Sequence, residues 1–348
     1  MRVDYIIVGF GLAGLAFVKE LEDHGKSFVV FEDDSQTSSN VAGGVYNPVI
    51  LKRFTPVWQG KQQLDLAIPF YREIEEKFNK KYDYSFDTFR VFKSVEEQNN
   101  WFTASDKPLL SEYMDTAIVK KKYNGVLSDY DFGKLKHTGR IDTKTLLDDY
   151  KKYLEKLELI YYETFSYKDM VVNANTVAYG EFQADCIVFC EGYGLHKNPY
   201  FNELPMNEAK GELLTIHAPD LEVDFLIKAA VFVLPLGDHY YKVGATFNWK
   251  DKSLKTTTAG KHELLSKLET FITVPYTVVD QTAGIRPTVK DRRPLVGVHQ
   301  KYKQLAVLNG LGTRGVMIAP KVAKELYLHL NNNIALDPET DIKRFVKG

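Results

Sequence analysis

Hydrophobic residues near the start of the chain form an unbroken run and then recur at helical spacing. Residues 3–8 are a short apolar run with β-branched side chains, which is typical of a buried parallel strand. From Leu12 to Asp23 the apolar positions alternate with small ones and the charges gather at the end, which predicts a helix that Gly25 stops. Residues 27–31 form a second strand-like run. The opening segment therefore predicts a strand, a helix and a strand of a parallel α/β unit.

Three glycines fill the predicted turn between the first strand and its helix. Gly9, Gly11 and Gly14 complete a G-x-G-x-x-G pattern, and Glu32 ends the second strand. Such glycines permit a tight turn, a close approach of the backbone to a pyrophosphate, and close packing of helix on strand. The helix N-terminus attracts the diphosphate, while Glu32 can accept hydrogen bonds from ribose hydroxyls. The segment predicts a dinucleotide site without a 2′-phosphate, and it leaves both FAD and NAD open.

The rest of the chain mixes helical and strand-like patterns. Helical spacing predicts helices over 62–78, bent or divided at Pro69, after Asp142, around 264–271, and from about Val316 to His329. Strand patterns cover 184–190, a hairpin of 225–236 with 239–246, an extended segment at 273–279, and 304–308. We therefore expect an α/β fold in which a Rossmann-type domain is interrupted by a largely antiparallel β-sheet domain with helices. The expected boundaries are 1–50, 135–205 and 283–348 for the first domain, and 51–134 and 206–282 for the second.

Composition and charge narrow the class of protein. Among 348 residues, 45 Lys and Arg face 46 Asp and Glu, so no global positive field exists to attract nucleic acid or an anionic membrane. Cys186 and Cys190 cannot form a disulfide framework and are expected to be buried structural thiols, and the dispersed histidines predict no metal site. The apolar stretch 5–18 is too short to span a bilayer and lacks a cleavage site. We expect a cytoplasmic protein that does not associate with a membrane.

Four stretches together resemble the D-amino-acid oxidase and glycine oxidase superfamily of FAD-dependent amine oxidoreductases. They are the glycine motif, residues 38–45, residues 184–192, and the pair 283–297 with 310–320, which carries G-x-R-P followed by D-x-x-P-x-x-G. The resemblance covers nearly the whole chain and implies FAD as the cofactor of the Rossmann-type domain. It implies noncovalent binding, because the cysteine that holds flavin in sarcosine oxidase has no clear counterpart. The FAD-binding positions that it implies are Gly9, Gly11, Gly14, Glu32, Ser39, Ala42, Gly43, Gly44, Gly192, Gly310, Gly312, Thr313, Arg314, Gly315 and Val316.

The same resemblance implies a substrate site. Arg286 matches the family's arginine that pairs with the substrate carboxylate, for which a planar guanidinium offers two parallel hydrogen bonds. Lys242 falls where monomeric sarcosine oxidase has a lysine that activates oxygen. The N-terminus of the last helix would stabilise negative charge on the reduced flavin. Further substrate-lining candidates are Val45, Tyr46, Asn47 and Phe232.

The implied reaction is oxidation of the C–N bond of an amino acid or a carboxylate-bearing secondary amine, with hydride transfer to flavin N5 and reoxidation by oxygen or another electron acceptor. Phe232 and Thr313 depart from glycine oxidase, which has a tyrosine and an arginine there. Residues 310–315 look closer to the flavin domain of the bifunctional enzyme that modifies the tRNA wobble uridine, so oxidation of a glycine-like substituent on tRNA is an alternative, disfavoured by the neutral charge. A second alternative is a catalytically silent flavin-binding subunit of a larger dehydrogenase. No pattern specifies a homo-oligomer.

Overall fold

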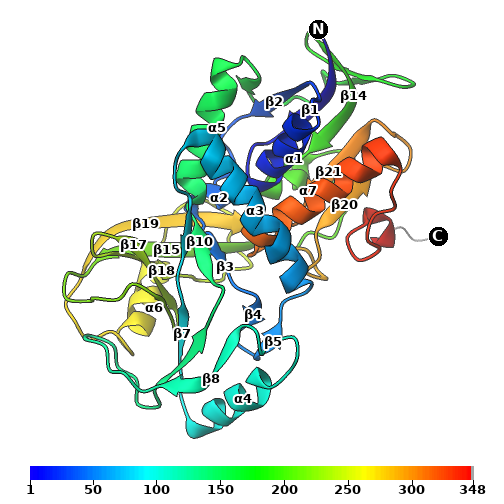
Figure 1. Cartoon of the computed structure of the whole chain (residues 1–348). Helices are drawn as coiled ribbons and strands as arrows, with labels where there is room; N and C mark the ends of the chain where they lie inside the picture. Colours follow the sequence, from blue (N-terminus) through cyan, green and yellow to red (C-terminus); the bar gives the residue numbers. More distant parts are fainter. Residues whose placement is uncertain (346–348) are drawn as a thin grey trace. The chain divides into compact units, whose positions relative to one another are not determined.

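Two parts of the chain each build a sheet and a core of their own (Figure 1). The computed structural model describes residues 1–345. Unit 1 comprises Met1–Ala42, Thr143–Ala209 and the described residues from Ile285 onward, and unit 2 comprises Gly43–Asp142 and Lys210–Gly284. The chain thus passes from unit 1 to unit 2 after Ala42 and returns after Asp142, where the sequence suggested residues 50 and 134. The assignment of the units as cofactor and substrate domains stays a proposal.

An eight-stranded sheet forms the centre of unit 1, in the order β11-β2-β1-β14-β13-β12, with β21 beside the second half of β14 and β20 beside β21. Part of this sheet is parallel, so the carboxyl ends of its strands meet at one edge. The parallel strands are β1, β2, β11, β14 and β21. The strands are β1 (Arg2–Val8), β2 (Phe28–Glu32), β11 (Ile160–Tyr162), β12 (Val171–Val172), β13 (Val177–Tyr179), β14 (Phe182–Phe189), β20 (Leu295–Val298) and β21 (Leu305–Asn309).

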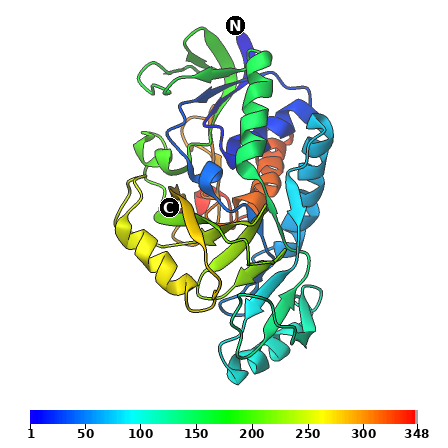
Figure 2. The same ribbon diagram turned by 90° about the vertical axis from the view of Figure 1, so that its left-hand side faces the viewer.

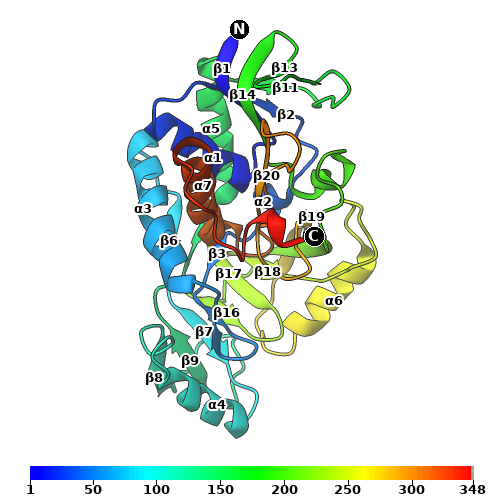
Figure 3. The ribbon, with the colours of Figure 1, turned by 90° about the vertical axis from the view of Figure 1, so that its right-hand side faces the viewer.

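Helices α1 (Leu12–Asp23) and α7 (Gly315–Asn332) lie side by side in unit 1 (Figures 1 and 3). The predicted boundaries of α1 are confirmed, and Gly25 adopts the positive φ that follows a helix end. The opposite face of the sheet packs an aromatic-rich core that includes Phe31, Phe165 and Phe189. Unit 1 also contains α2 (Ser38–Val41), α5 (Thr143–Lys156), η1 (Gly192–Lys197) and η2 (Ile342–Phe345).

Unit 2 is built on a second eight-stranded sheet, in the order β19-β15-β18-β17-β16-β7-β9-β8. Helix α6 (Thr258–Leu268) covers one face, where Leu264 and Leu268 join the core (Figure 2). The strands are β7 (Thr88–Val91), β8 (Met114–Val119), β9 (Phe132–Leu135), β15 (Ala209–His217), β16 (Leu226–Lys228), β17 (Phe232–Gly237), β18 (Tyr240–Gly244) and β19 (Thr277–Arg286). The smaller elements of unit 2 are β3 (Val45–Tyr46), β4 (Val49–Ile50), β5 (Thr55–Pro56), α3 (Gly60–Phe78), β6 (Asp83–Ser85), α4 (Val95–Ser105) and β10 (Gly139–Ile141).

Unit 2 differs from the expected pattern in three places. Helix α3 is not divided at Pro69, because its buried face, with Leu64, Tyr71 and Ile74, offsets the roughly 3 kcal/mol that an interior proline costs. The run 225–236 forms two strands, since a tight turn in which the Ala229 N–H donates to the Val231 carbonyl (2.9 Å) separates β16 from β17. The extended segment expected at 273–279 begins only at Thr277.

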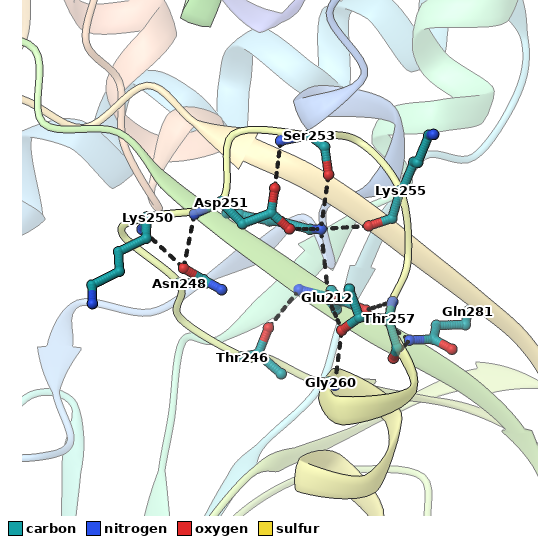
Figure 4. A network of polar contacts seen from close by, with 11 residues as sticks. Glu212, Thr246, Asn248, Lys250, Asp251, Ser253, Lys255, Thr257, Gly260 and Gln281 are labelled. Atoms are coloured by element: carbon teal, nitrogen blue, oxygen red, sulfur yellow. Dashed lines mark hydrogen bonds and ion pairs between the residues drawn. The ribbon is translucent and has the colours of Figure 1, made fainter.

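A buried polar network ties the loop 245–257 of unit 2 to the sheet (Figure 4). The Lys210 ammonium, whose side chain is 1% exposed, donates to Asp251 (2.6 Å) and to the Lys255 carbonyl, and it lies 3.7 Å from Glu212. The Glu212 carboxylate accepts hydrogen bonds from Thr257, whose hydroxyl in turn caps α6. The network therefore fixes the loop and the start of α6 together.

Within residues 1–345, no helix combines the length and apolar character that crossing a bilayer requires.

Candidate active site

The glycine turn after β1 has the close packing that the motif predicts. A β-carbon on Gly14 would stand less than 3.0 Å from the carbonyl oxygen of Gly9, and one on Gly9 would stand 2.8 Å from the carbonyl oxygen of Cys190. Gly9 also has a φ of +92°, which L side chains rarely adopt. The N-cap residue Gly11 has no side chain that could cap α1, and apart from the Leu12 N–H, which donates to Ser39, the first N–H groups of the helix are left for a phosphate. The turn therefore fits a dinucleotide diphosphate.

Glu32 lies at the carboxyl end of β2, beside this turn. Its carboxylate accepts hydrogen bonds from the backbone N–H groups of Phe10 and of Asp34, and Lys151 lies 3.7 Å away. Burial raises the pKa of Glu32, while Lys151 and the two N–H groups oppose that shift. The carboxylate thus holds the glycine loop in place, and its remaining lone pairs fit the predicted bond to ribose.

The segment 38–42 packs against the same loop. The Ser39 hydroxyl accepts a hydrogen bond from the Leu12 N–H (3.2 Å), and its oxygen would lie 3.0 Å from a β-carbon on Gly11. The Ser39 carbonyl accepts from the Thr143 hydroxyl (2.6 Å), and the Ser38 hydroxyl donates to the Ile285 carbonyl. Ser39 thus contacts the nucleotide motif, and an FAD-binding role for Ser39 and Ala42 stays a prediction.

Two further loops reach this edge of the unit 1 sheet. The Asn309 side chain at the end of β21 donates to the Gly192 carbonyl (3.0 Å), which joins the turn after β14 to the loop before α7. Gly310 and Gly312 have φ values of +73° and +62°, and a β-carbon on Gly310 would stand 2.5 Å from Val289. Gly315 opens α7 against Leu12. The predicted positions 192 and 310–316 therefore lie around the ends of β1, β14 and β21, with Thr313 exposed.

Arg286 and Arg314 carry the positive charge of this region of unit 1. Arg286 ends β19, and the next residue, Pro287, accepts a hydrogen bond from the Gly312 N–H (3.1 Å). Burial lowers the pKa of Arg286 to about 10, so the side chain is cationic at neutral pH. Burial and Arg292 also lower the pKa of Arg314, which precedes the first residue of α7. The structure thus places Arg286 beside the loop that opens α7.

In unit 2, the glycines of residues 43–45 allow the chain to pass close to its neighbours. Gly44 has a φ of +64°, and a β-carbon there would collide with the Ile141 carbonyl. A β-carbon on Gly43 would stand 3.4 Å from Leu234 and 3.6 Å from the Phe232 ring. The structure therefore brings Gly43, Val45 and Phe232 together.

The remaining predicted residues of unit 2 have different surroundings. The Tyr46 hydroxyl donates to Asp83 (2.8 Å) within the small sheet of β3, β10 and β6, and the Asn47 side chain accepts from the Val49 N–H (2.8 Å). Lys242 is half-buried in β18. Burial and the nearby Arg140 lower the pKa of Lys242, while Asp142 and Asp280 oppose the shift. A substrate-lining role for Tyr46 and Asn47 stays a prediction.

Sequence patterns did not indicate Glu191, a carboxyl group directly beside the glycine turn. Its Cα would lie 3.3 Å from a β-carbon on Gly9, and its carboxylate accepts from the Asn198 side chain (2.8 Å) and the Tyr167 hydroxyl. Burial raises its pKa to about 7. The position directly follows the run 184–190, but nothing in the spacing reveals that Tyr167 and Asn198 meet there. Cys186 and Cys190 are buried, as expected.

A sequence model of the DAO family, described as FAD dependent oxidoreductase, matches residues 4–327. The chain belongs to this family, and it is an FAD-dependent oxidoreductase. The family binds FAD, and the glycine turn, the Ser39 contact and the start of α7 described above fit that cofactor.

The relatives that match the chain in sequence include two differently named enzymes. The chain is 28% identical over 171 residues to the bifunctional tRNA 5-methylaminomethyl-2-thiouridine biosynthesis protein MnmC of Azoarcus sp., an alignment of 43% of this chain and 27% of that protein. It is 26% identical over 148 residues to glycine oxidase of Bacillus subtilis, covering 40% of each. The matched part is thus less than half of either relative. The crystal structure of glycine oxidase from Geobacillus kaustophilus has the same fold, with a TM-score of 0.80 at 19% identity over 99% of this chain and all of that one.

Proposed function

We propose that this protein oxidises the C–N bond of an amino acid or of a secondary amine that carries a carboxylate. Bound FAD would supply the acceptor for a hydride from the carbon next to nitrogen, and water would hydrolyse the resulting C=N bond to a carbonyl compound and to ammonia or, from a secondary amine, to an amine. Oxygen or another electron acceptor then takes up the two electrons. The task of the protein is to hold the amine in place and to stabilise charge.

The position of Arg286 carries this proposal. Its guanidinium belongs to the residue before Pro287, whose carbonyl accepts from the Gly312 N–H in the loop that opens α7. A half-buried arginine beside the cofactor loop offers a planar, permanently charged partner for a substrate carboxylate. The name of the Bacillus relative, glycine oxidase, supports an amino-acid substrate.

We further propose that Lys242 assists reoxidation of the cofactor. A half-buried ammonium stabilises the negative charge that develops on oxygen as oxygen accepts electrons. Lys242→Met is then expected to slow reoxidation by oxygen while leaving reduction by the amine nearly unchanged. Equal rates of reoxidation in Lys242→Met and in the wild type would contradict this role.

A second candidate is oxidation of a glycine-like substituent on tRNA. The similarity to MnmC of Azoarcus and the loop 310–315 favour it. The same Arg286 would then bind the carboxylate of that substituent. Reduction of the cofactor by carboxymethylaminomethyl-uridine, together with strongly salt-dependent tRNA binding, would support this candidate over free amino acids.

Steady-state kinetics of Arg286 variants test the proposal. Arg286→Met is expected to raise the KM of a carboxylate-bearing amine about a hundredfold, whereas Arg286→Lys, which keeps the charge, raises it less. The visible flavin spectrum of both variants should match that of the wild type, because the arginine acts on the substrate. A KM unchanged by Arg286→Met contradicts the proposed role.

A further inference from the structure

Lys228 ends β16 at the hairpin that leads into β17. The strand register pairs it with Phe232 in β17 on one side and with Arg90 in β7 on the other. The side chain is half-buried, and its ammonium lies 5.8 Å from the centre of the Phe232 ring. Among residues 1–345, this ring is the partner that the ammonium has; no carboxylate or carbonyl oxygen accepts a hydrogen bond from it.

Four lysines of the chain that are nearly fully buried each pair with a carboxylate. Lys19 pairs with Asp23 (2.6 Å), Lys210 with Asp251 (2.6 Å), and Lys151 and Lys321 with Asp34 and Glu325. A buried ammonium is costly without such a partner, because the protein replaces its water with a medium of lower polarity. Lys228 is half-buried and has an aromatic ring in place of such a carboxylate.

The charged groups around Lys228 increase this cost. Its electrostatic neighbours are three cations, Arg90, Lys93 and Lys267, which together with burial lower its pKa to about 8. The adjacent acid, Glu97, already accepts from Arg90 (2.6 and 3.0 Å) and from the Lys93 N–H (2.8 Å). Lys267 pairs with Glu263 (2.6 Å). The region thus carries unbalanced positive charge.

Lys228 shares a face of the unit 2 sheet with the residues proposed to line the substrate. Successive side chains of a strand point to opposite faces, and Ile227, Val233 and Val243 point into the core on the α6 side. Lys228, Phe232 and Lys242 therefore lie on the other face, with Phe232 opposite Gly244 and Leu234 opposite Lys242. This is also the face on which Gly43 approaches the Phe232 ring.

We propose that Lys228 is a specificity residue that binds a second anionic group of the substrate, so that the preferred substrates are amines or amino acids with two carboxylates. The inference rests on the proposed function and adds the substrate class to it. A bound carboxylate supplies the missing counter-charge, whereas a neutral group at the same place leaves the ammonium desolvated. The Phe232 ring packs beside the ammonium, 5.8 Å from it, and so helps to hold the lysine in place.

Paired substrates that differ in one charge test the role of Lys228 in the FAD-loaded enzyme. We would compare glutamate with glutamine, in both enantiomers, and iminodiacetate with sarcosine. The wild type should prefer the dicarboxylate of a pair by about tenfold in kcat/KM, Lys228→Gln should lose that preference through KM, and Lys228→Arg should retain most of it. Lys267→Gln, which removes a neighbouring charge of the same sign, is the matched control and should keep the preference.

Calorimetric titration with malonate and acetate separates this inference from the proposed function, since neither anion has an amine to oxidise. Malonate should bind the wild type about tenfold more tightly than Lys228→Gln, and acetate should bind both proteins equally. If no amine reduces the enzyme but malonate discriminates as expected, the proposed function fails and the anion site stands. A malonate affinity that Lys228→Gln leaves unchanged, or a wild type that prefers the neutral member of each pair, overturns the inference.

Discussion

Gly14 in the first turn of α1 packs so closely on Gly9 that a β-carbon on Gly14 would lie less than 3.0 Å from the Gly9 carbonyl oxygen. This carbonyl belongs to the backbone, which cannot move aside as a flexible side chain does. The contact sets the distance between β1 and α1, and with it the position of the N–H groups that we expect to face the cofactor diphosphate.

Gly14→Ala is therefore expected to weaken FAD binding. Overpacking of this kind costs about 1–3 kcal/mol, which corresponds to a loss of about tenfold to a hundredfold in affinity if it falls on the bound form. Titration of the apoprotein with FAD, followed by flavin fluorescence, measures the change.

Gly25→Ala is the control for this substitution. Gly25 also has a positive φ, +63°, but a β-carbon there would meet no atom within 4 Å. This variant should lose some stability and keep its FAD affinity. Equal FAD affinities in Gly14→Ala and the wild type would show that the turn does not hold the cofactor.

The pKa of Glu191 gives a pH dependence of stability. Burial raises this pKa to about 7 in the folded protein, above the ordinary value of 4.5, so the folded state binds the proton more tightly than the unfolded state does. The contribution to the free energy of unfolding is fully present below about pH 4.5 and is lost as the pH rises through about 7. We expect about 2 kcal/mol to be lost across that window.

Glu191→Gln keeps the shape of the side chain and removes its titration. Urea unfolding of the variant at several pH values should show a flatter pH profile than the wild type, with the difference largest between about pH 5 and 7. Glu203→Gln, at an exposed carboxylate, should leave the profile unchanged. Parallel profiles of Glu191→Gln and the wild type would rule out a raised pKa at this position.

Lys210 should be a large contributor to the stability of unit 2. Lys210→Met leaves the buried Glu212 carboxylate without the cation that lies 3.7 Å away, and breaking a buried pair costs about 3 kcal/mol. Lys250→Met, on the exposed part of the same loop, should change the free energy of unfolding by less than about 0.5 kcal/mol. If the two variants unfold at the same urea concentration, the network does not stabilise the loop.

Local sequence patterns predicted the helices and strands whose buried residues recur at a regular spacing. The run 3–8, the helix Leu12–Asp23 and the strand before Glu32 appear as β1, α1 and β2, because each buries residues at a regular period. The turn at Ala229–Val231 was missed, since no glycine, proline or asparagine marks it. The strands β3, β6 and β10 are too short to show a period, and only their pairing defines them.

For the candidate site, too, the sequence predicted the local motif but not the contacts between distant residues. The glycines and Glu32 follow from a motif with fixed spacing, but the bond from Leu12 to Ser39 and the partners of Glu191 join residues that are far apart in the sequence. The sequence also could not predict that Lys228 lacks a carboxylate partner, because the nearby Glu97 carboxylate pairs with Arg90 instead. Contacts of this kind arise from tertiary packing and leave no signal in a single sequence.

Anaerobic addition of amines to the purified, FAD-loaded protein tests the central claim most directly. The panel would contain glycine, sarcosine, iminodiacetate, D- and L-amino acids and carboxymethylaminomethyl-uridine, together with matching amines that lack the carboxylate. We predict that at least one carboxylate-bearing amine bleaches the visible flavin bands and that its counterpart without the carboxylate does not. A flavin spectrum that no amine in the panel changes, or equal bleaching by amines with and without a carboxylate, would contradict the proposed function.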